Sequence, residues 1–242
     1  MKKASIFIVL IVLSNFVVAQ RNKNFTGVMA GVSMPFNEYQ YAEKFSGDGY
    51  AKMGFAGGLD LSVFFTPNIG IGGKFSYGIN GINKSAMEKA LETYVNTKTV
   101  SVITKPDEKI KYYLDNWTIL SVMIGPELSL PIGRFSWDVR YLIGVANIYP
   151  PVAEAKLVYY NGTFKTQREN TNALSFGMSG GTSFRFALSD SYSLKLAADY
   201  TMCKSKITVT DTPNTNHPTT TTSEYKQNIN NLQICFGIGY NF

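Results

Sequence analysis

Hydrophobic and polar residues alternate with a period of two along most of the chain. In the segment 54–65, Phe55 and Leu59 share one face. The opposite face of this segment carries Gly58 and Asp60. Because successive side chains of a β-strand point to opposite faces, the alternation predicts strands with one apolar and one polar face. Eight segments show it: 27–34, 54–65, 70–79, 118–130, 135–146, 174–186, 192–201 and 231–242.

The connections between these segments alternate in length. Tight turns, such as 66–68 and 131–134, join the second segment to the third, the fourth to the fifth and the sixth to the seventh. The other four connections are long and polar. Short turns at one rim and long loops at the other are typical of outer-membrane barrels, whose sheets close because lipid offers no hydrogen bonds. The prediction is an all-β fold: an eight-stranded antiparallel transmembrane β-barrel with short periplasmic turns and long extracellular loops.

A soluble β-sandwich or a lipocalin-like barrel would also alternate. Here the polar face is mostly Gly, Ser and Ala, whereas a face open to water usually carries Lys, Glu and Thr. Small residues are what a narrow, filled lumen requires. Aromatic residues also gather near the expected membrane interfaces. They are Phe65, Phe135, Phe186, Tyr192 and Phe242 on the turn side, and Tyr77, Trp117 and Tyr200 on the loop side. The membrane barrel is therefore favoured.

The N-terminus has the three parts of a secretory signal peptide. Lys2 and Lys3 precede the apolar run 6–13, and Ala19 is small enough for cleavage before Gln20. The alternative is a retained membrane anchor, but the run is shorter than the ~20 residues that a spanning helix needs. We expect a signal peptide over residues 1–19 and one barrel domain over residues 20–242, without a lipid anchor.

Composition narrows the classes of function further. No second long apolar stretch is present, which argues against a helical membrane protein. One histidine and two cysteines cannot build a zinc site or a dense disulfide framework. The formal charge of +6 includes Lys2 and Lys3 and is too modest and dispersed for nucleic-acid binding. We expect no metal, no cofactor and no nucleic-acid partner.

Charged residues lie on the polar faces of the strands, four of each sign. They are Asp60, Lys74, Glu127, Asp138, Arg140, Arg185, Lys195 and Asp199. Counting from the turns places Asp60 opposite Lys74 and places Glu127 and Asp138 near Arg140. One interpretation is a buried ion network that fills the lumen, because an unpaired charge there would be costly. The other is an ion path or gate. An eight-stranded interior is just wide enough for side chains, so no sizeable pore is expected.

The two cysteines and the histidine carry little chemistry. Cys203 and Cys235 face the lumen on the last two strands, at what the spacing indicates to be similar heights. A disulfide is one alternative, and two free buried thiols are the favoured one. His217 lies in a Pro- and Thr-rich stretch that indicates a solvated loop, and no spacing of residues nominates a catalytic centre.

Two of the long loops contain further patterns. Ser85-Ala86-Met87-Glu88 is a capping box that predicts a short helix through Val95. The segments 97–104 and 110–114 could form a hairpin beyond the membrane. The loop 148–172 contains several tyrosines, which are either contact residues or an extension of the outer aromatic belt.

A resemblance to a known family rests on three features. They are Ala19-Gln20, the Gly-rich alternating strands and the terminal Gly237-Ile238-Gly239-Tyr240-Asn241-Phe242. Together they resemble the small outer-membrane β-barrel family of Bacteroidota, which includes PorT-like proteins and is similar in design to OmpX and OmpA-type barrels. The resemblance implies that Tyr240 and Phe242 form the C-terminal signal read by the barrel-assembly machinery. No periplasmic peptidoglycan-binding domain is expected after Phe242.

The leading hypothesis is a non-enzymatic barrel that acts in envelope structure, in surface interaction or in a PorT-like, type IX export assembly. Its expected partners are outer-membrane lipid and lipopolysaccharide, the barrel-assembly machinery, and envelope or secretion-complex proteins. The alternatives are a narrow ion or small-solute channel that uses the lumen charges, and a lipid-modifying enzyme.

Overall fold

A computed structural model describes residues 24–43, 48–99, 111–159, 162–169, 173–214 and 221–242. The expected signal peptide and His217 lie outside these residues. Eight strands form a closed ring in which every neighbouring pair is antiparallel. In ring order they are β1 (Phe25–Phe36), β2 (Ala51–Phe64), β3 (Ile69–Ile82), β5 (Trp117–Ile132), β6 (Phe135–Tyr149), β9 (Ala173–Ala187), β10 (Tyr192–Asn214) and β11 (Thr221–Asn241). The predicted barrel is confirmed.

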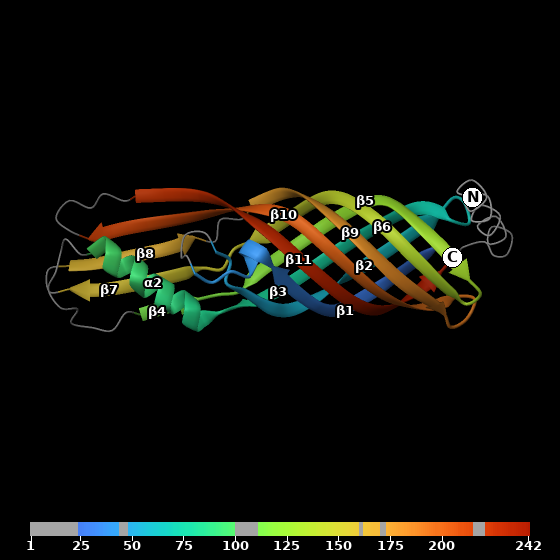
Figure 1. Cartoon of the computed structure of the whole chain (residues 1–242), viewed down its shortest axis with the longest axis horizontal. Coiled ribbons are helices and arrows are strands. Elements are labelled where there is room, and N and C mark those ends of the chain that lie inside the picture. The colour runs from blue at the N-terminus through green and yellow to red at the C-terminus, as the bar shows by residue number, and fades with distance from the viewer. Residues whose placement is uncertain (1–23, 44–47, 100–110, 160–161, 170–172, 215–220) are drawn as a thin grey trace, which may run out of the picture.

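The first and last strands close the ring. β1 pairs with β11 from Phe25 opposite Asn241 to Phe36 opposite Asn230. Just outside this ladder, the Asn24 amide donates to the carbonyl of Phe242 (3.2 Å), and the Phe242 amide donates back to Asn24 (3.1 Å). The three short turns and the C-terminus lie at the same end of the tube (Figure 1). By the usual asymmetry of these barrels, this end is periplasmic.

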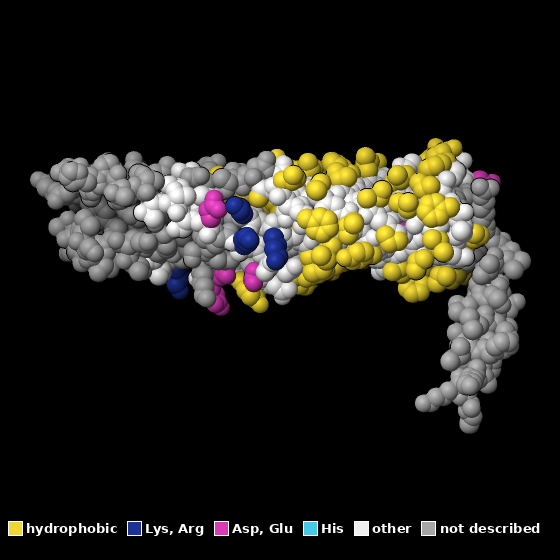
Figure 2. Space-filling view, turned by 90° about the horizontal axis from the view of Figure 1, so that it is seen from above, with side chains coloured by type: hydrophobic (Ala, Val, Ile, Leu, Met, Phe, Trp, Pro, Cys, Tyr) yellow, Lys and Arg dark blue, Asp and Glu magenta, His cyan; other side chains and the backbone are white. Residues whose placement is uncertain are grey.

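The outer face of the ring carries large apolar side chains that water would not normally touch. Val28, Ile124 and Val122 are 55–62% exposed, and hydrophobic side chains cover this part of the face of the molecule that Figure 2 shows. At the periplasmic end the rings of Phe135 and Phe186 lie 4.7 Å apart between centroids. An exposed apolar band with aromatic residues at its border is the surface that a bilayer covers. Among the described residues, no helix is long and apolar enough to cross a membrane.

The inner face is lined by small residues because the strands enclose a narrow space. A Cβ atom built on Gly31 would overlap the carbonyl oxygen of Ile234, and one on Gly144 would overlap that of Val122. The Gly-rich polar face seen in the sequence is therefore a steric requirement of the wall. Gly133 has a different role, because its φ of +64° forms the turn between β5 and β6.

Beyond the closed ring, at the end opposite the short turns, the sheet continues along one part of its circumference. β10 pairs with β9 as far as Cys203 opposite Gly177, and from Thr208 onward it pairs with β8 (Gly162–Glu169). β8 pairs with β7 (Ala153–Tyr159), and β7 pairs with β4 (Lys111–Leu114). The outer parts of β11 and β10 together with β8, β7 and β4 form what we call the extracellular sheet. Helix α2 (Lys84–Thr99) lies beside it (Figure 1).

Several loop predictions change as a result. The helix predicted through Val95 is confirmed and extends to Thr99. The predicted hairpin of 97–104 with 110–114 is wrong, because residues 97–99 are helical and β4 pairs with β7. Residues 100–110 lie outside the described part of the chain. The loops 148–172 and 202–230 contain strands, since the long β10–β11 hairpin offers an edge on which β8 and β7 can add hydrogen bonds.

Candidate functional site: the barrel interior and the extracellular sheet

The periplasmic end of the lumen is closed by a buried ion pair among aromatic rings. The Arg185 guanidinium donates from Nε to Asp138 Oδ2 (2.7 Å) and from Nη2 to Oδ1 (3.1 Å). Ser129 Oγ also donates to Asp138. The guanidinium carbon lies 5.8 Å from the ring centroid of Phe25 and 5.1 Å from that of Phe64. Phe25 has no exposed surface, so this layer forms a floor.

The middle of the lumen is organised around Arg140. Its Nε and Nη2 donate to the two carboxylate oxygens of Asp199 (2.9 and 2.8 Å), and its Nη1 donates to Asp60 Oδ1 (2.8 Å). Lys74 Nζ adds a bond to Asp199 Oδ2 (2.8 Å), and Lys195 Nζ adds one to Asp60 Oδ1 (3.2 Å). Bidentate geometry and shared partners join five charged side chains into one network.

Glu127 completes the set of lumen charges. Its Oε1 accepts a hydrogen bond from Ser62 Oγ (3.0 Å) and lies 3.9 Å from Lys195 Nζ. The side chain has no exposed surface, and a Cβ atom on Gly72 would lie 2.5 Å from its Oε2. Because Gly72 has no side chain, the Glu127 carboxylate can occupy the space next to it.

All eight charged side chains selected from the sequence point into the lumen, but their partners differ from those that counting suggested. Asp60 does lie opposite Lys74 in the ladder, yet Lys74 pairs with Asp199. Glu127 lies opposite Arg140, yet its cation is Lys195. Long side chains reach across the lumen, whereas register counting sees only the neighbouring strand.

Uncharged polar residues, which sequence reasoning missed, extend the network. Gln233 Oε1 accepts a hydrogen bond from Lys74 Nζ (2.8 Å). Nearer the outer end, Ser33 Oγ donates to Asn80 Oδ1 (2.8 Å), and Asn231 Nδ2 donates to Ser33 Oγ (2.8 Å). The alternation of the strands does place these residues on the lumen face. Amides and hydroxyls carry no charge, however, so nothing in the sequence distinguished them as members of a network.

Tyr39 joins this polar layer to the cap above it. Its hydroxyl donates to Asn80 Oδ1 (3.2 Å). Burial raises the pKa of the Tyr39 phenol well above its ordinary value, so the hydroxyl keeps its proton and remains a donor. Tyr39 follows β1 in the short helix η1 (Asn37–Tyr39), which folds inward over the end of the ring.

An apolar cluster caps the outer end of the lumen. The Trp117 ring meets the Tyr39 ring edge-on, with centroids 5.2 Å apart, and its Nε1 donates to the carbonyl of Gly49 (2.7 Å). Met87 and Leu91 of α2 pack into the same cluster and have no exposed surface. We call this group the apolar cap. The prediction that Trp117 belongs to the outer aromatic girdle is wrong, because its parity in β5 is that of the lumen-facing residues.

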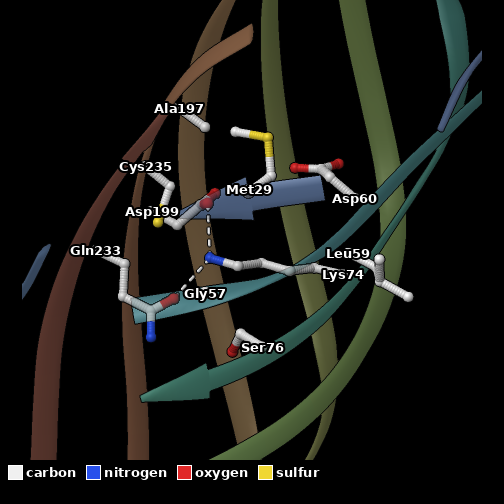
Figure 3. Close-up of a pocket in the computed structure, with 10 residues that line it drawn as sticks. All are labelled: Met29, Gly57, Leu59, Asp60, Lys74, Ser76, Ala197, Asp199, Gln233 and Cys235. Carbon is white, nitrogen blue, oxygen red and sulfur yellow. Dashed lines mark hydrogen bonds and ion pairs between the residues drawn. The ribbon is translucent and has the colours of Figure 1, made fainter. Parts of the chain in front are cut away.

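A small cavity lies beside the Lys74–Asp199 pair in the middle of the lumen. Figure 3 shows Lys74 directed at Asp199 and Gln233, with Cys235 and Met29 on the surrounding walls. The cavity measures about 10 Å³, room for one water molecule. The floor, the ion network and the apolar cap occupy the rest of the line along which a solute would have to travel.

The two cysteines lie at different heights. Cys203 is opposite Ile229, whereas Cys235 is opposite Ala197. Six positions along β10 correspond to about 20 Å, far more than a disulfide can span. Both thiols are free and buried, so the favoured interpretation is confirmed and the expectation of similar heights is wrong.

Tyr240 and Phe242 lie at the periplasmic end of β11 with their rings on the outer face. Tyr240 is 48% and Phe242 55% exposed, and the Tyr240 ring meets that of Tyr192 edge-on at 6.0 Å. They stand where the apolar band ends.

A closed ring of antiparallel strands with a lipid-facing apolar band and a filled interior defines a transmembrane β-barrel. The sequence profile of the family described as "Outer membrane protein beta-barrel domain" matches residues 6–242. The chain therefore belongs to this family, and the protein is an integral outer-membrane protein. No curated protein matches the sequence.

Solved structures with a similar arrangement include two bacterial outer-membrane proteins. The attachment invasion locus protein Ail of Yersinia pestis is 13% identical, with 91% of this chain and 100% of that chain covered and a TM-score of 0.41. OprG of Pseudomonas aeruginosa is also 13% identical, with 93% and 98% covered and a TM-score of 0.48.

Proposed function

We propose that the protein is a non-enzymatic outer-membrane protein that acts at the cell surface through its extracellular sheet. The observation that carries this proposal is the unbroken pairing of β10 with β11, from Tyr192 opposite Tyr240 to Asp211 opposite Thr221. Closure of the ring requires only the part of β10 that pairs with β9 and the part of β11 that pairs with β1. The outer part of this hairpin is extended by three further strands, which do nothing to close the barrel, so a binding surface is the function that best explains them.

The finer role that we favour is adhesion to, or assembly with, another envelope component. A PorT-like part in a type IX export assembly is one form of this role. It is supported by the combined resemblance of Ala19-Gln20, the Gly-rich strands and the terminal Gly237–Phe242 segment to the family that includes PorT-like proteins. We further propose that residues 1–19 are a cleavable signal peptide and that the barrel-assembly machinery reads Tyr240 and Phe242. Lipid and lipopolysaccharide would surround the apolar band.

The lumen favours this role over the two alternatives. A channel would require an ion to separate Arg140 from its two carboxylates and to pass the apolar cap. A lipid-modifying enzyme needs a base beside a nucleophile or an activated water at the lipid-facing surface. The carboxylates of the ring instead point inward, where Arg140, Arg185 and the two lysines hold them.

Site-specific photo-crosslinking in intact cells tests the proposal. A photoreactive residue replaces Thr222 or Glu224, both exposed on the outer part of β11, and the matched control replaces Ile143 on the lipid-facing wall. We expect the two outer positions to capture one discrete partner that the wall position does not. A partner captured only at Ile143 would assign the function to the wall, and no partner at any position would overturn the proposal.

A further inference from the structure

Three lysines lie together on the outer face of β10 and β11, directly beyond the apolar band. Lys204 and Lys206 are exposed on β10, and Lys206 lies opposite the exposed Lys226 of β11. Figure 2 shows Lys and Arg side chains gathered at this border of the hydrophobic band. Like charges directly opposite each other destabilise a sheet, so an additional anion bound between Lys206 and Lys226 would stabilise this arrangement.

The carboxylates near the lysines leave room for such an anion. Glu224 pairs with Lys206 (3.2 Å), and the two side chains are 59% and 61% exposed. Glu38 is held at the β1 side, where its Oε2 accepts from the amide and the Nδ2 of Asn228 (3.2 and 2.8 Å). Within the described residues, no ion pair joins either of the other two lysines to a carboxylate.

Exposed apolar residues lie at the same height as the lysines. The Lys204 amide donates to Ser175 Oγ (3.2 Å), which places this part of β10 beside the outer end of β9. There Leu174 is 75% and Phe176 62% exposed, and Met202 just below the lysines is 41% exposed. Exposure to water is favourable for the lysines but not for these apolar side chains. The boundary between acyl chains and headgroups is favourable for both, because it offers hydrocarbon to one and charged groups to the other.

We propose that Lys204, Lys206 and Lys226 form a binding site for the phosphate of an anionic lipid in the outer leaflet, whose acyl chain lies on Leu174 and Phe176. The ammonium groups supply point charges for a phosphate, and the apolar pair supplies the surface that continues into the hydrocarbon. The site lies at the base of the extracellular sheet. It does not depend on any protein partner that the sheet binds.

The test uses the full chain in phosphatidylcholine nanodiscs with increasing mole fractions of diphosphoryl lipid A. Native mass spectrometry counts the lipid A molecules retained per barrel. We expect the mole fraction for half occupancy to rise about fivefold when one lysine becomes Gln and roughly 100-fold in the triple variant K204Q/K206Q/K226Q. The charge-preserving variant K204R/K206R/K226R should bind like the original chain.

A charge-matched control removes three exposed lysines elsewhere, in K52Q/K84Q/K89Q. An equal loss in this control would overturn the proposal, because it would show attraction to overall charge only. Inorganic phosphate, added to the chain in detergent without lipid, distinguishes the source of the phosphate. Binding of this ion as tight as that of lipid A would also overturn the proposal. Heat-modifiable migration on a denaturing gel verifies that each variant is a folded barrel.

Discussion

At the scale of single residues, stability depends on charges that have left water. Asp138 and Arg185 are almost completely buried and form two hydrogen bonds with each other. Desolvating two such groups is costly, and their mutual geometry recovers that cost. The consequence is asymmetric: the pair as a whole adds little, but either member alone is a strong liability.

Arg185→Leu should therefore lower the free energy of unfolding by about 3–5 kcal/mol, because it leaves the Asp138 carboxylate buried without its cation. The double variant D138L/R185L should recover most of this loss. Urea unfolding in lipid vesicles, followed by migration of unheated samples on a gel, measures both.

Glu224→Gln is the control for this experiment, since it removes an ion pair that is more than half exposed. Its effect should stay below about 1 kcal/mol. A loss in R185L no larger than that of the control would show that the floor of the lumen contributes no stability.

At the scale of elements, the two tryptophans lie in different environments: one belongs to the apolar cap and the other to the lipid-facing wall. Trp117 is fully buried under α2 and η1, whereas Trp137 is 42% exposed on the lipid-facing side of β6 and donates to Thr182 Oγ1 (2.7 Å). Fluorescence can therefore report on the cap and on the wall separately.

In vesicles that contain lipids brominated on their acyl chains, we expect strong quenching of W117F, which retains only Trp137. The variant W137F, which retains only Trp117, should be quenched weakly by these lipids and weakly by aqueous iodide. Strong iodide quenching of W137F would contradict the cap, because it would place Trp117 in contact with water.

The barrel strands were predictable from the sequence, whereas the extracellular sheet was not. In β5 and β9, lipid on one side and a narrow lumen on the other enforce strict alternation. Beyond the membrane this constraint ends, so β8 (Gly162–Glu169) is mostly polar and resembles a loop. Its pairing partners in β10 lie far along the chain, from Thr208 opposite Glu169 to Asn214 opposite Thr163. The same limit applies to the lumen: parity identified all eight charges, but contacts across the barrel, such as Lys74 to Asp199, depend on three-dimensional closure.

At the scale of the whole molecule, three successive layers obstruct the lumen. They are the Phe25–Arg185 floor, the network around Arg140 and the apolar cap. We expect the purified protein to give no conductance steps in planar bilayers under conditions in which a porin of known conductance does. Regular steps that disappear in Arg140→Gln would contradict this expectation and would favour the channel hypothesis.

The length of the β10–β11 hairpin determines how far the protein extends from the membrane surface. Residues 204–214 of β10 continue for about 36 Å past the last pairing with β9, and at a tilt near 40° they rise about 28 Å. The headgroup layer of one leaflet is only about 5–8 Å thick. The outer ends of β10 and β11 thus stand well clear of the lipid surface, and a partner as large as an antibody or a neighbouring cell's receptor could touch them without approaching the bilayer.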